Sequence, residues 1–465
     1  MKQLLTYYLL IASFSTFAQM SNTLTPAAKV YGLSRFWQEV NYNFVYLSKV
    51  NKNEWDSTYL TLIDKVQKTE NDYDYYRLMK QFCAMLKDGH TNIDYPEAIQ
   101  KKLMKTMFGE YRIFIENIEH KAIITRVNPS KKEIIPPGSE IIAVNNLPIN
   151  EYLNRFVSPF ISSSTSHIIE DISTEEMLQG LEGEKYKLKI KKTNGEIIEL
   201  VVEHSKCSET EIYPIKNADN SLLSLKWKEN KTAYLALNSF QDKTIDSLFV
   251  SKLPELYEAK ALIIDLRNNG GGNGDYGLEI LKYLIPNKKV SGSKSRTRNH
   301  IATYKAWGEM TSPKDTTNNP DYCKAYLSYI GEYYYNFPQA PRTLKTSQKR
   351  LIIPTAVLIG HNTASAAEDF LVYANKQPHF TKIGAPTFGS TGQPYYFLLP
   401  GGAQARVCTK QDTYPDGTEF VGFGIPPDIF VEQTLSDYLK NIDTQLEKAI
   451  NFLNQELNQS NRQSR

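Results

Sequence analysis

Hydrophobic residues recur at helical spacing in the first part of the chain. Between residues 27 and 95, apolar side chains repeat every three or four positions on both sides of a polar break, which predicts amphipathic helices. Residues 108–148 differ, because short β-rich runs alternate there with polar turns. A helix over 150–160 and a hairpin about Asn194-Gly195 complete what we interpret as a small β-barrel module.

Strands and helices alternate in the second half of the chain. The strands expected at 232–237 and 261–266 enclose a helix over 245–259. A further buried strand, Thr355–Gly360, leads through a short polar turn into a helix over 366–374. This alternation predicts an α/β domain with parallel crossover connections.

An insertion with weak periodicity, residues 291–345, interrupts this domain and holds many of the chain's 30 tyrosines. We expect the aromatic side chains of residues 303–338 to pack the insertion onto the core as a satellite cluster. The alternative is a lid that grips an extended peptide. Residues 451–465 are polar and are expected to fray.

The N-terminus has the pattern of an export signal. Met1-Lys2 is followed by the apolar stretch Leu4–Phe14 and by small residues in Thr16-Phe17-Ala18. This predicts a signal peptide over 1–18 and a mature chain that is periplasmic or secreted, without a stable membrane anchor. The alternative is a short anchor, but the apolar run is shorter than the roughly 18–20 residues of a spanning helix.

Composition excludes some classes of function. The chain has 465 residues, and 54 Lys and Arg against 51 Asp and Glu give a net charge of +3, too small for a general nucleic-acid binder. The 7 His and 4 Cys show no metal-ligand spacing, so we expect neither a metal nor another cofactor. The cysteines are Cys83, Cys207, Cys323 and Cys408.

A glycine run, Gly270–Gly277, follows a predicted strand and opens a helix. Gly272-x-Gly274-x-x-Gly277 fits a dinucleotide fingerprint, but no acidic residue follows at the spacing needed to hold a ribose. The alternative is that backbone N–H groups of the run stabilise negative charge, as in an oxyanion hole.

A serine, Ser365, stands where a buried strand turns into a helix. A nucleophile at such a corner would lie near aligned N–H groups. Taken alone, the segment is better explained as a helix cap, because Ser365 and Glu368 fit a capping box.

Four motifs that follow one another along the chain favour a catalytic role for Ser365 over the helix-cap interpretation. They are Asp265-Leu-Arg-Asn-Asn-Gly-Gly-Gly272, Ser365-Ala-Ala-Glu368, Gly384-Ala-Pro-Thr-Phe-Gly389 and Gly424-Ile-Pro-Pro-Asp428. The upstream segments Pro137–Pro148 and Lys87-Asp-Gly-His-Thr91 add to the set, which resembles the C-terminal processing (tail-specific) serine peptidase family, including its tricorn-like branch. The resemblance covers most of residues 80–435.

The resemblance implies an α/β fold with a crotonase/ClpP-like ββα catalytic core, preceded or interrupted by a PDZ-like β-barrel module, and an N-terminal helical segment. The implied domains are 19–105 (helical), 106–205 (PDZ-like) and 206–450 (catalytic). Met107-Phe-Gly-Glu110 is a poor match to a carboxylate-binding loop, so capture of substrate C-termini is not supported, and a hinged gate is the other role for this module.

The resemblance also implies site residues. Ser365 would be the nucleophile, and the Ala366 N–H with a glycine N–H would form the oxyanion hole. Gly271 is the preferred glycine among the three candidates, which also include Gly270 and Gly272.

The base departs from the common pattern of the family. Many relatives place a lysine after Thr-Phe-Gly, where this chain has Ser390, and Lys382 lies before that segment. His90 is therefore the expected base, because imidazole exchanges protons near neutral pH. Glu419 is preferred as the acid that orients it, and Glu368 is the competitor.

The resulting hypothesis is an exported serine endopeptidase acting on peptides or unfolded proteins, with oligomers possible. The alternatives are a non-catalytic ligand- or peptide-binding protein on the same fold and an exported esterase or amidase.

Overall fold

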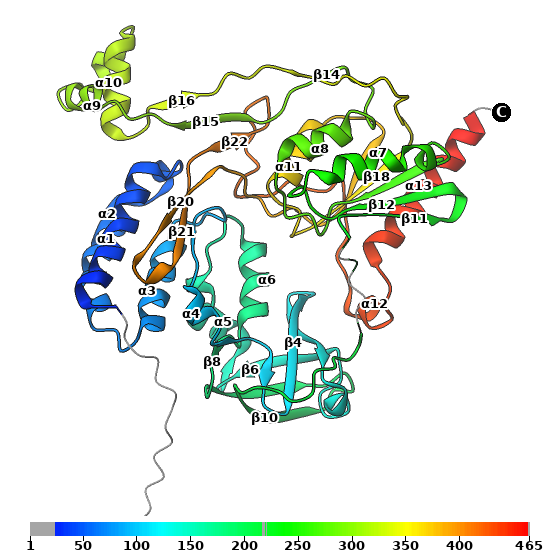
Figure 1. Ribbon diagram of the computed structural model, residues 1–465, viewed down its shortest axis with the longest axis horizontal. Helices are drawn as coiled ribbons and strands as arrows, with labels where there is room; N and C mark the ends of the chain where they lie inside the picture. The colour runs from blue at the N-terminus through cyan, green and yellow to red at the C-terminus, as the bar shows by residue number, and fades with distance from the viewer. Residues whose placement is uncertain (1–23, 216–218, 220, 464–465) are drawn as a thin grey trace, which may run out of the picture.

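The computed structural model describes residues 24–215, 219 and 221–463 (Figure 1). The signal expected at 1–18 lies outside these residues. Within them, no helix combines the length and apolar character needed to cross a bilayer. The four cysteines are free thiols, of which Cys83 and Cys408 are buried.

The first segment is a helical layer, as its periodicity predicts. It comprises α1 (Pro26–Asn43), α2 (Lys52–Gln67) and α3 (Asp72–Ala84). Each helix begins after a residue whose side chain accepts a backbone N–H at its first turn, which satisfies donors that the helix leaves free: Thr25, Asn51 and Asn71. The buried rings of Trp55 and Phe82 stack at 3.8 Å between α2 and α3.

Residues 103–205 contain an antiparallel sheet with a hydrophobic core of its own. Its strand order is β10-β9-β6-β5-β4-β3, and β7 pairs with β6. The helices of this region are α5 (Ile149–Phe156) and α6 (Ser166–Glu176), and α6 packs against β4. The strands are β3 (Met107–Phe108), β4 (Tyr111–Ile118), β5 (Lys121–Val127), β6 (Ser139–Val144), β7 (Leu147–Pro148), β9 (Lys185–Lys191) and β10 (Ile197–Glu203). The assignment of this sheet domain as PDZ-like stays a prediction.

The second half is an α/β domain with the strand order β11-β12-β13-β18-β19-β23. Strand β11 is antiparallel to β12, and all later neighbours are parallel. The strands are β11 (Leu223–Lys228), β12 (Thr232–Leu237), β13 (Ala261–Asp265), β18 (Thr355–Ile359), β19 (Phe380–Gly384) and β23 (Ile429–Phe430).

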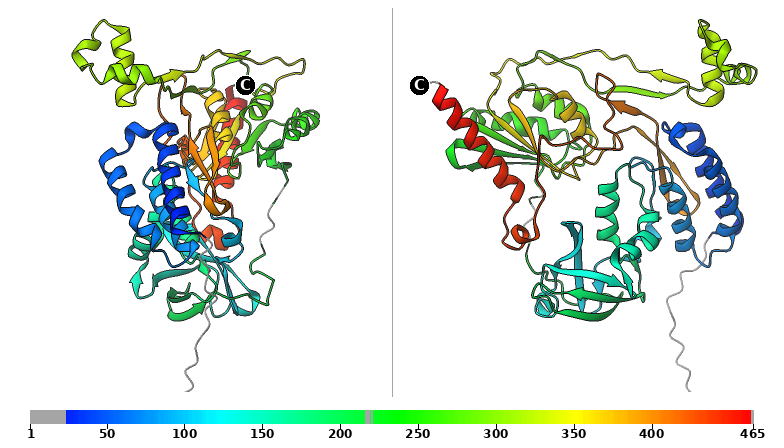
Figure 2. Two further views of the ribbon diagram at one scale, coloured as in Figure 1. Left: turned by 60° about the vertical axis from the view of Figure 1, so that its left-hand side comes forward. Right: turned by 180° about the vertical axis from the view of Figure 1, so that it is seen from behind.

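Helices cover both faces of this sheet (Figure 2). Leu262 and Ile264 face the core shared with α7 (Thr244–Leu256), α8 (Gly274–Leu281) and α11 (Ala366–Tyr373), whereas Ile263 faces α13 (Thr444–Gln463). Because the strands from β12 onward are parallel, the loops after β13, β18 and β19 all emerge at one edge, where ligands of open α/β sheets bind.

The insertion forms an arm that extends over the helical layer (Figure 1). Strands β15 (Lys294–Arg298) and β16 (Tyr334–Asn336) carry α9 (Ala302–Gly308) and α10 (Pro320–Ile330) at its end. The prediction that its aromatic residues pack onto the core holds for Tyr334, near the base of the arm, and was wrong for the aromatic residues of the two helices at its end. Helices α9 and α10 pack on each other, and Trp307 and Tyr322 are both more than half exposed, at 55% and 53%.

The remaining elements are short and connect these parts. They are β1 (Asn92–Ile93), α4 (Glu97–Gln100), β2 (Leu103–Met104), β8 (Gly180–Leu181), β14 (Lys289–Val290), β17 (Arg342–Thr343), β20 (Pro394–Leu398), β21 (Gln404–Cys408), β22 (Gln411–Thr413) and α12 (Leu435–Leu439).

Candidate active site

Two loops at the carboxyl edge of the sheet are joined by one buried asparagine. Asn269 follows β13, and its backbone oxygen accepts the Ala364 N–H at 3.0 Å. Its side-chain oxygen accepts the Gly271 N–H at 3.0 Å, and its amide nitrogen donates to Leu237 O at 2.9 Å. The glycine loop is therefore fixed against the segment that precedes α11.

Ser365 lies at that junction in an unusual backbone conformation. Its φ is 56° and its ψ is −118°, a region that costs a non-glycine residue about 1–3 kcal/mol. Buried Thr363 holds the turn, because its hydroxyl donates to Leu266 O at 2.9 Å and accepts the Gly360 N–H at 3.1 Å. Strain maintained in this way is a feature of functional corners and supports more than a capping role.

The three candidate glycines differ in their relation to Ser365. Gly271, at φ 97°, is so close that an added Cβ would lie 2.7 Å from Ser365 Cβ and 2.9 Å from Ala366 N. An added Cβ on Gly272 would instead clash with the backbone of Phe240, and one on Gly270 would meet no atom within 4 Å. Gly271 is thus the glycine whose small size allows the loop to approach Ser365.

Glu368 is a buried acceptor that joins three segments of the site. One carboxylate oxygen accepts the Ser365 N–H at 3.1 Å and the Ser390 N–H at 3.3 Å. The other accepts the Thr387 hydroxyl at 2.5 Å and the Gly389 N–H at 2.8 Å. Burial raises the pKa of Glu368 to about 7, although the four donated hydrogen bonds favour the ionised form.

Replacing Glu368 by glutamine is expected to lower the free energy of unfolding by about 2–4 kcal/mol, because in either orientation its NH2 group would face at least one N–H donor in a buried site. Urea denaturation of the Glu368→Gln variant measures this. The control is Glu447→Gln, at an exposed position of α13, which we expect to be neutral. Equal midpoints for the two variants would show that Glu368 does not organise the site.

His90 is brought to this site by a contact with Ser390. His90 Nδ1 lies 2.6 Å from Ser390 Oγ, and the Ser390 N–H shares a Glu368 oxygen with the Ser365 N–H. Among the described residues, no hydrogen bond joins His90 directly to Ser365. Through Ser390 the imidazole is linked to the serine corner, with Nδ1 in contact with a hydroxyl and Nε2 without a hydrogen bond to any residue that the structure describes.

The charge state of His90 is set by its surroundings. Burial lowers its pKa to about 4, and the cations Arg406 and Lys410 act in the same direction. The carboxylate of Asp412 opposes them, and it forms an ion pair with Lys410 at 3.0 Å. At neutral pH the imidazole is therefore uncharged, which is the form that can accept a proton.

The expected acid Glu419 and two further residues of the sequence motifs have partners of their own. Glu419 pairs with Lys49 at 3.1 Å and accepts a hydrogen bond from Gln411 at 3.2 Å, so the structure does not join it to His90. Lys382 pairs with Asp428 at 3.0 Å. Thr91 is fully buried and accepts the Cys408 N–H at 3.0 Å, which anchors the His90 loop to β21.

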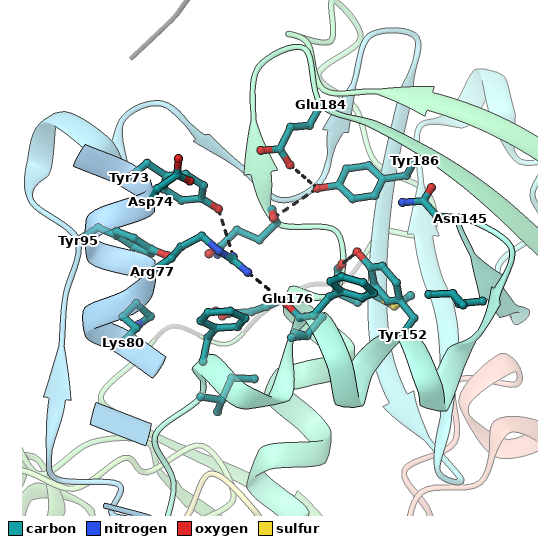
Figure 3. A pocket seen from close by; sticks show the side chains of 17 residues that line it. Tyr73, Asp74, Arg77, Lys80, Tyr95, Asn145, Tyr152, Glu176, Glu184 and Tyr186 are labelled. Carbon is teal, nitrogen blue, oxygen red and sulfur yellow. Dashed lines mark hydrogen bonds between the residues drawn. The ribbon is translucent and has the colours of Figure 1, made fainter. Parts of the chain in front are cut away.

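The described residues contain no group of three or more His, Cys, Asp or Glu side chains arranged to hold a metal ion. A cavity of about 530 Å³ lies between α3 and the sheet domain (Figure 3). Arg77 crosses it, donating to Phe156 O at 3.3 Å and to the Tyr73 hydroxyl at 3.4 Å. None of its lining residues comes from the glycine loop or from α11, so it is separate from the serine corner.

Comparison with known proteins assigns the segment that carries Ser365. Residues 231–431 match the family model described as peptidase family S41. This segment, less than half of the chain, is similar to peptidase family S41. The S41 segment contains the glycine loop, Ser365, Glu368 and Ser390, whereas His90 lies outside it.

Individual relatives share either sequence or fold. A carboxy-terminal-processing protease of Bartonella bacilliformis is 26% identical over 227 residues, covering 47% of this chain and 43% of the relative. The chain thus matches less than half the length of this curated relative. The crystal structure of mature CPAF has a TM-score of 0.64 and 12% identity, covering 89% of this chain and 94% of that one. A structure of mature CPAF complexed with lactacystin has a TM-score of 0.63 and 14% identity, covering 90% and 97%. Because both identities are low, these structures show a common fold only.

Two residues of the site were not predicted in their observed roles. Ser390 was noted only as the residue in place of a lysine, although its hydroxyl contacts His90. Asn269 was only part of a motif, and no local signal shows that it joins two loops. The Thr387-Phe-Gly-Ser390 segment was the available signal, since it placed a small hydroxyl where many relatives have a base.

Proposed function

We propose that the chain is a serine endopeptidase in which Ser365 attacks a peptide carbonyl and His90 accepts the serine proton. The observation that carries this proposal is the strained Ser365 corner, closed on one side by Gly271 and flanked by the His90–Ser390 pair. Similarity of residues 231–431 to the S41 family supports the reaction type, and the carboxy-terminal-processing relative supports peptide or unfolded-protein substrates.

Proton transfer follows from the tautomer of His90. With Nδ1 protonated and donating to Ser390 Oγ, the lone pair is on Nε2, which is then the atom that accepts the Ser365 proton. Ser390 then does for His90 what a carboxylate does in other serine peptidases, namely fix the ring and its tautomer. Glu419 remains the weaker proposal for an additional acid, because Lys49 and Gln411 occupy its carboxylate.

Charge on the tetrahedral intermediate needs backbone donors. We assign the larger part of the stabilisation of the oxyanion to the Ala366 N–H. This N–H belongs to the first residue of α11 and has no hydrogen-bond partner among the described residues. The Gly271 N–H is the second donor, shared with Asn269 Oδ1. As the tetrahedral intermediate collapses to the acyl-enzyme, the His90 imidazolium gives its proton to the leaving amine. His90 then takes a proton from the water that hydrolyses the acyl-enzyme, and returns it to Ser365 Oγ.

The pH dependence should identify His90 through its neighbours. Lys410 lowers the pKa of His90 and Asp412 raises it, so Lys410→Gln is expected to raise it by removing a cation. Protonated His90 cannot act as a base, so the acid limb of kcat/KM should move to higher pH by about half a unit. Asp412→Asn should move it the other way. Measuring kcat/KM against pH, over the range in which circular dichroism shows folded protein, checks these shifts. If the wild type, Lys410→Gln and Asp412→Asn all had the same acid limb, His90 would not be the base.

Cleavage of an unfolded protein tests the function as a whole. We expect the residue 19–465 chain to convert reduced, carboxymethylated casein into peptides that mass spectrometry identifies. Stoichiometric binding of casein without new termini would instead favour a non-catalytic binding protein on this fold. Hydrolysis of small esters alone would favour an esterase. We also propose export to the periplasm or the exterior, on the basis of the N-terminal signal pattern.

A further inference from the structure

A second cavity lies between the helical layer and the arm. Its volume is about 690 Å³, and one wall is the end of α1 with the residues that follow it, while the other is the end of β15 with α9 and α10. Tyr42 from the first wall stacks on His300 from the second with ring centroids 4.2 Å apart. The cavity is thus built jointly by two segments about 250 residues apart in sequence.

Arg298 lines this cavity, and two of its three guanidinium nitrogens make no hydrogen bond to the described residues. Its Nη1 donates to Asn41 O at 2.8 Å and to Tyr42 O at 3.2 Å, which satisfies carbonyls at the end of α1. Its Nε is buried without a partner, and Nη2 has no hydrogen bond within the described residues. These two nitrogens form the edge that binds a carboxylate in bidentate fashion, and no carboxylate of the described chain pairs with them.

Two further buried polar atoms of the cavity lining lack partners. Lys52 donates to Asn41 Oδ1 at 2.9 Å, which fixes the amide so that its NH2 group is the unpaired end. The Ser328 hydroxyl on α10 is also unpaired. Buried polar groups are nearly always hydrogen-bonded, so three unpaired donors around one cavity indicate that an acceptor-rich ligand completes it.

The charge of the lining indicates the sign of that ligand. Lys52, Arg298 and Lys305 line the cavity, against Glu332 as the acidic residue of the lining. Asp56 neutralises Lys52 in an ion pair at 2.7 Å, so Arg298 and Lys305 provide the positive charge that a ligand would meet. Trp37 and Tyr329 add aromatic surface, which suits the backbone and aliphatic stems of a peptide. The cavity between α3 and the sheet domain differs, because none of its lining residues has a buried unpaired atom.

We propose that the cavity between α1 and the α9–α10 arm binds a glutamate or aspartate side chain of an acidic peptide segment, with Arg298 Nε and Nη2 gripping the carboxylate. Asn41 Nδ2 and the Ser328 hydroxyl donate to the same segment, and Lys305 provides the surrounding positive charge. This is an exosite, and its occupancy does not depend on hydrolysis at Ser365.

Fluorescence anisotropy of the full chain carrying Ser365→Ala tests the site without cleavage. The probe is a fluorescein-labelled peptide with four consecutive glutamates and blocked ends, and the matched probe has four glutamines. We expect the glutamate probe to bind at least about tenfold more tightly, because two charge-assisted hydrogen bonds are lost with the amide. Arg298→Lys, which keeps the charge but loses the fork, and Lys305→Ala should each weaken binding, by about tenfold and about threefold.

The control variant is Lys314→Ala, which removes an exposed positive charge from the arm outside the cavity and should leave binding unchanged. Ser328→Ala, which removes an unpaired hydroxyl and should not perturb folding, gives a second test inside the cavity. Equal affinity for the two probes, or equal weakening by Lys305→Ala and Lys314→Ala, would overturn the proposal. Displacement by free glutarate at the same concentration as an unlabelled glutamate peptide would also overturn it, since the site would then recognise a small carboxylate.

Discussion

Replacing Ser365 by alanine is expected to lower kcat/KM for peptide hydrolysis by about 10⁴-fold or more, because the variant has no atom that can form the acyl-enzyme. Stability should change little, since Ser365 is only half-buried and its backbone N–H still donates to Glu368. Initial rates on a quenched fluorescent peptide, with thermal unfolding measured in parallel, test both statements.

The control for this variant is Ser436→Ala, at an exposed position of α12. It removes a hydroxyl far along the chain from the serine corner and should retain the wild-type rate. If Ser365→Ala retained more than about one tenth of the rate, the nucleophile would be another residue.

Replacing His90 by alanine should lower kcat/KM by a factor comparable to that of Ser365→Ala, because nucleophile and base act as one unit. The two effects should not add, so the double variant is expected to be no slower than either single variant. A rate for the double variant well below both would show that the two residues act independently.

His120→Ala is the matched control for His90. His120 is an exposed imidazole that pairs with Glu170 at 2.9 Å, and no contact links it to Ser365. Its rate should equal that of the wild type. A loss of activity in His120→Ala as large as in His90→Ala would indicate a general effect of histidine loss and not a specific base.

The strands and helices of the second half could be predicted from the sequence because short runs of neighbouring residues specify them. The strands around Ile263 and Val357 are continuous apolar runs, which is the pattern of parallel strands buried on both faces. The turn chemistry at Asn194-Gly195 likewise placed a hairpin between β9 and β10 correctly.

The packing of the arm could not be predicted in this way. Its tyrosines have the composition of a buried cluster, but composition does not say which surface they contact. Gly308 allows α9 to approach the backbone of α10 closely, so the two helices form their own small unit in place of packing on the core. Tyr334, near the base of the arm, donates instead to Val45 O of the helical layer at 3.2 Å.

The site was predicted as a set of residues but not as a geometry. Motif order indicated the glycine loop and Ser365, which lie after the adjacent parallel strands β13 and β18, and Glu368, which lies in the first turn of α11. His90 is 275 positions from Ser365 in sequence, and its placement depends on the Ser390 contact, which no periodicity reveals. Glu419 was expected near His90 from its position in the sequence motifs, but its carboxylate pairs with Lys49 and not with the imidazole.

A fluorophosphonate reacts covalently with activated serines, so the residue that it labels identifies the nucleophile of this chain. We predict a single phosphonyl adduct on the peptide containing Ser365, absent in Ser365→Ala and much slower to form in His90→Ala. An adduct at another serine, or labelling of Ser365→Ala at the wild-type rate, would show that Ser365 is not the nucleophile.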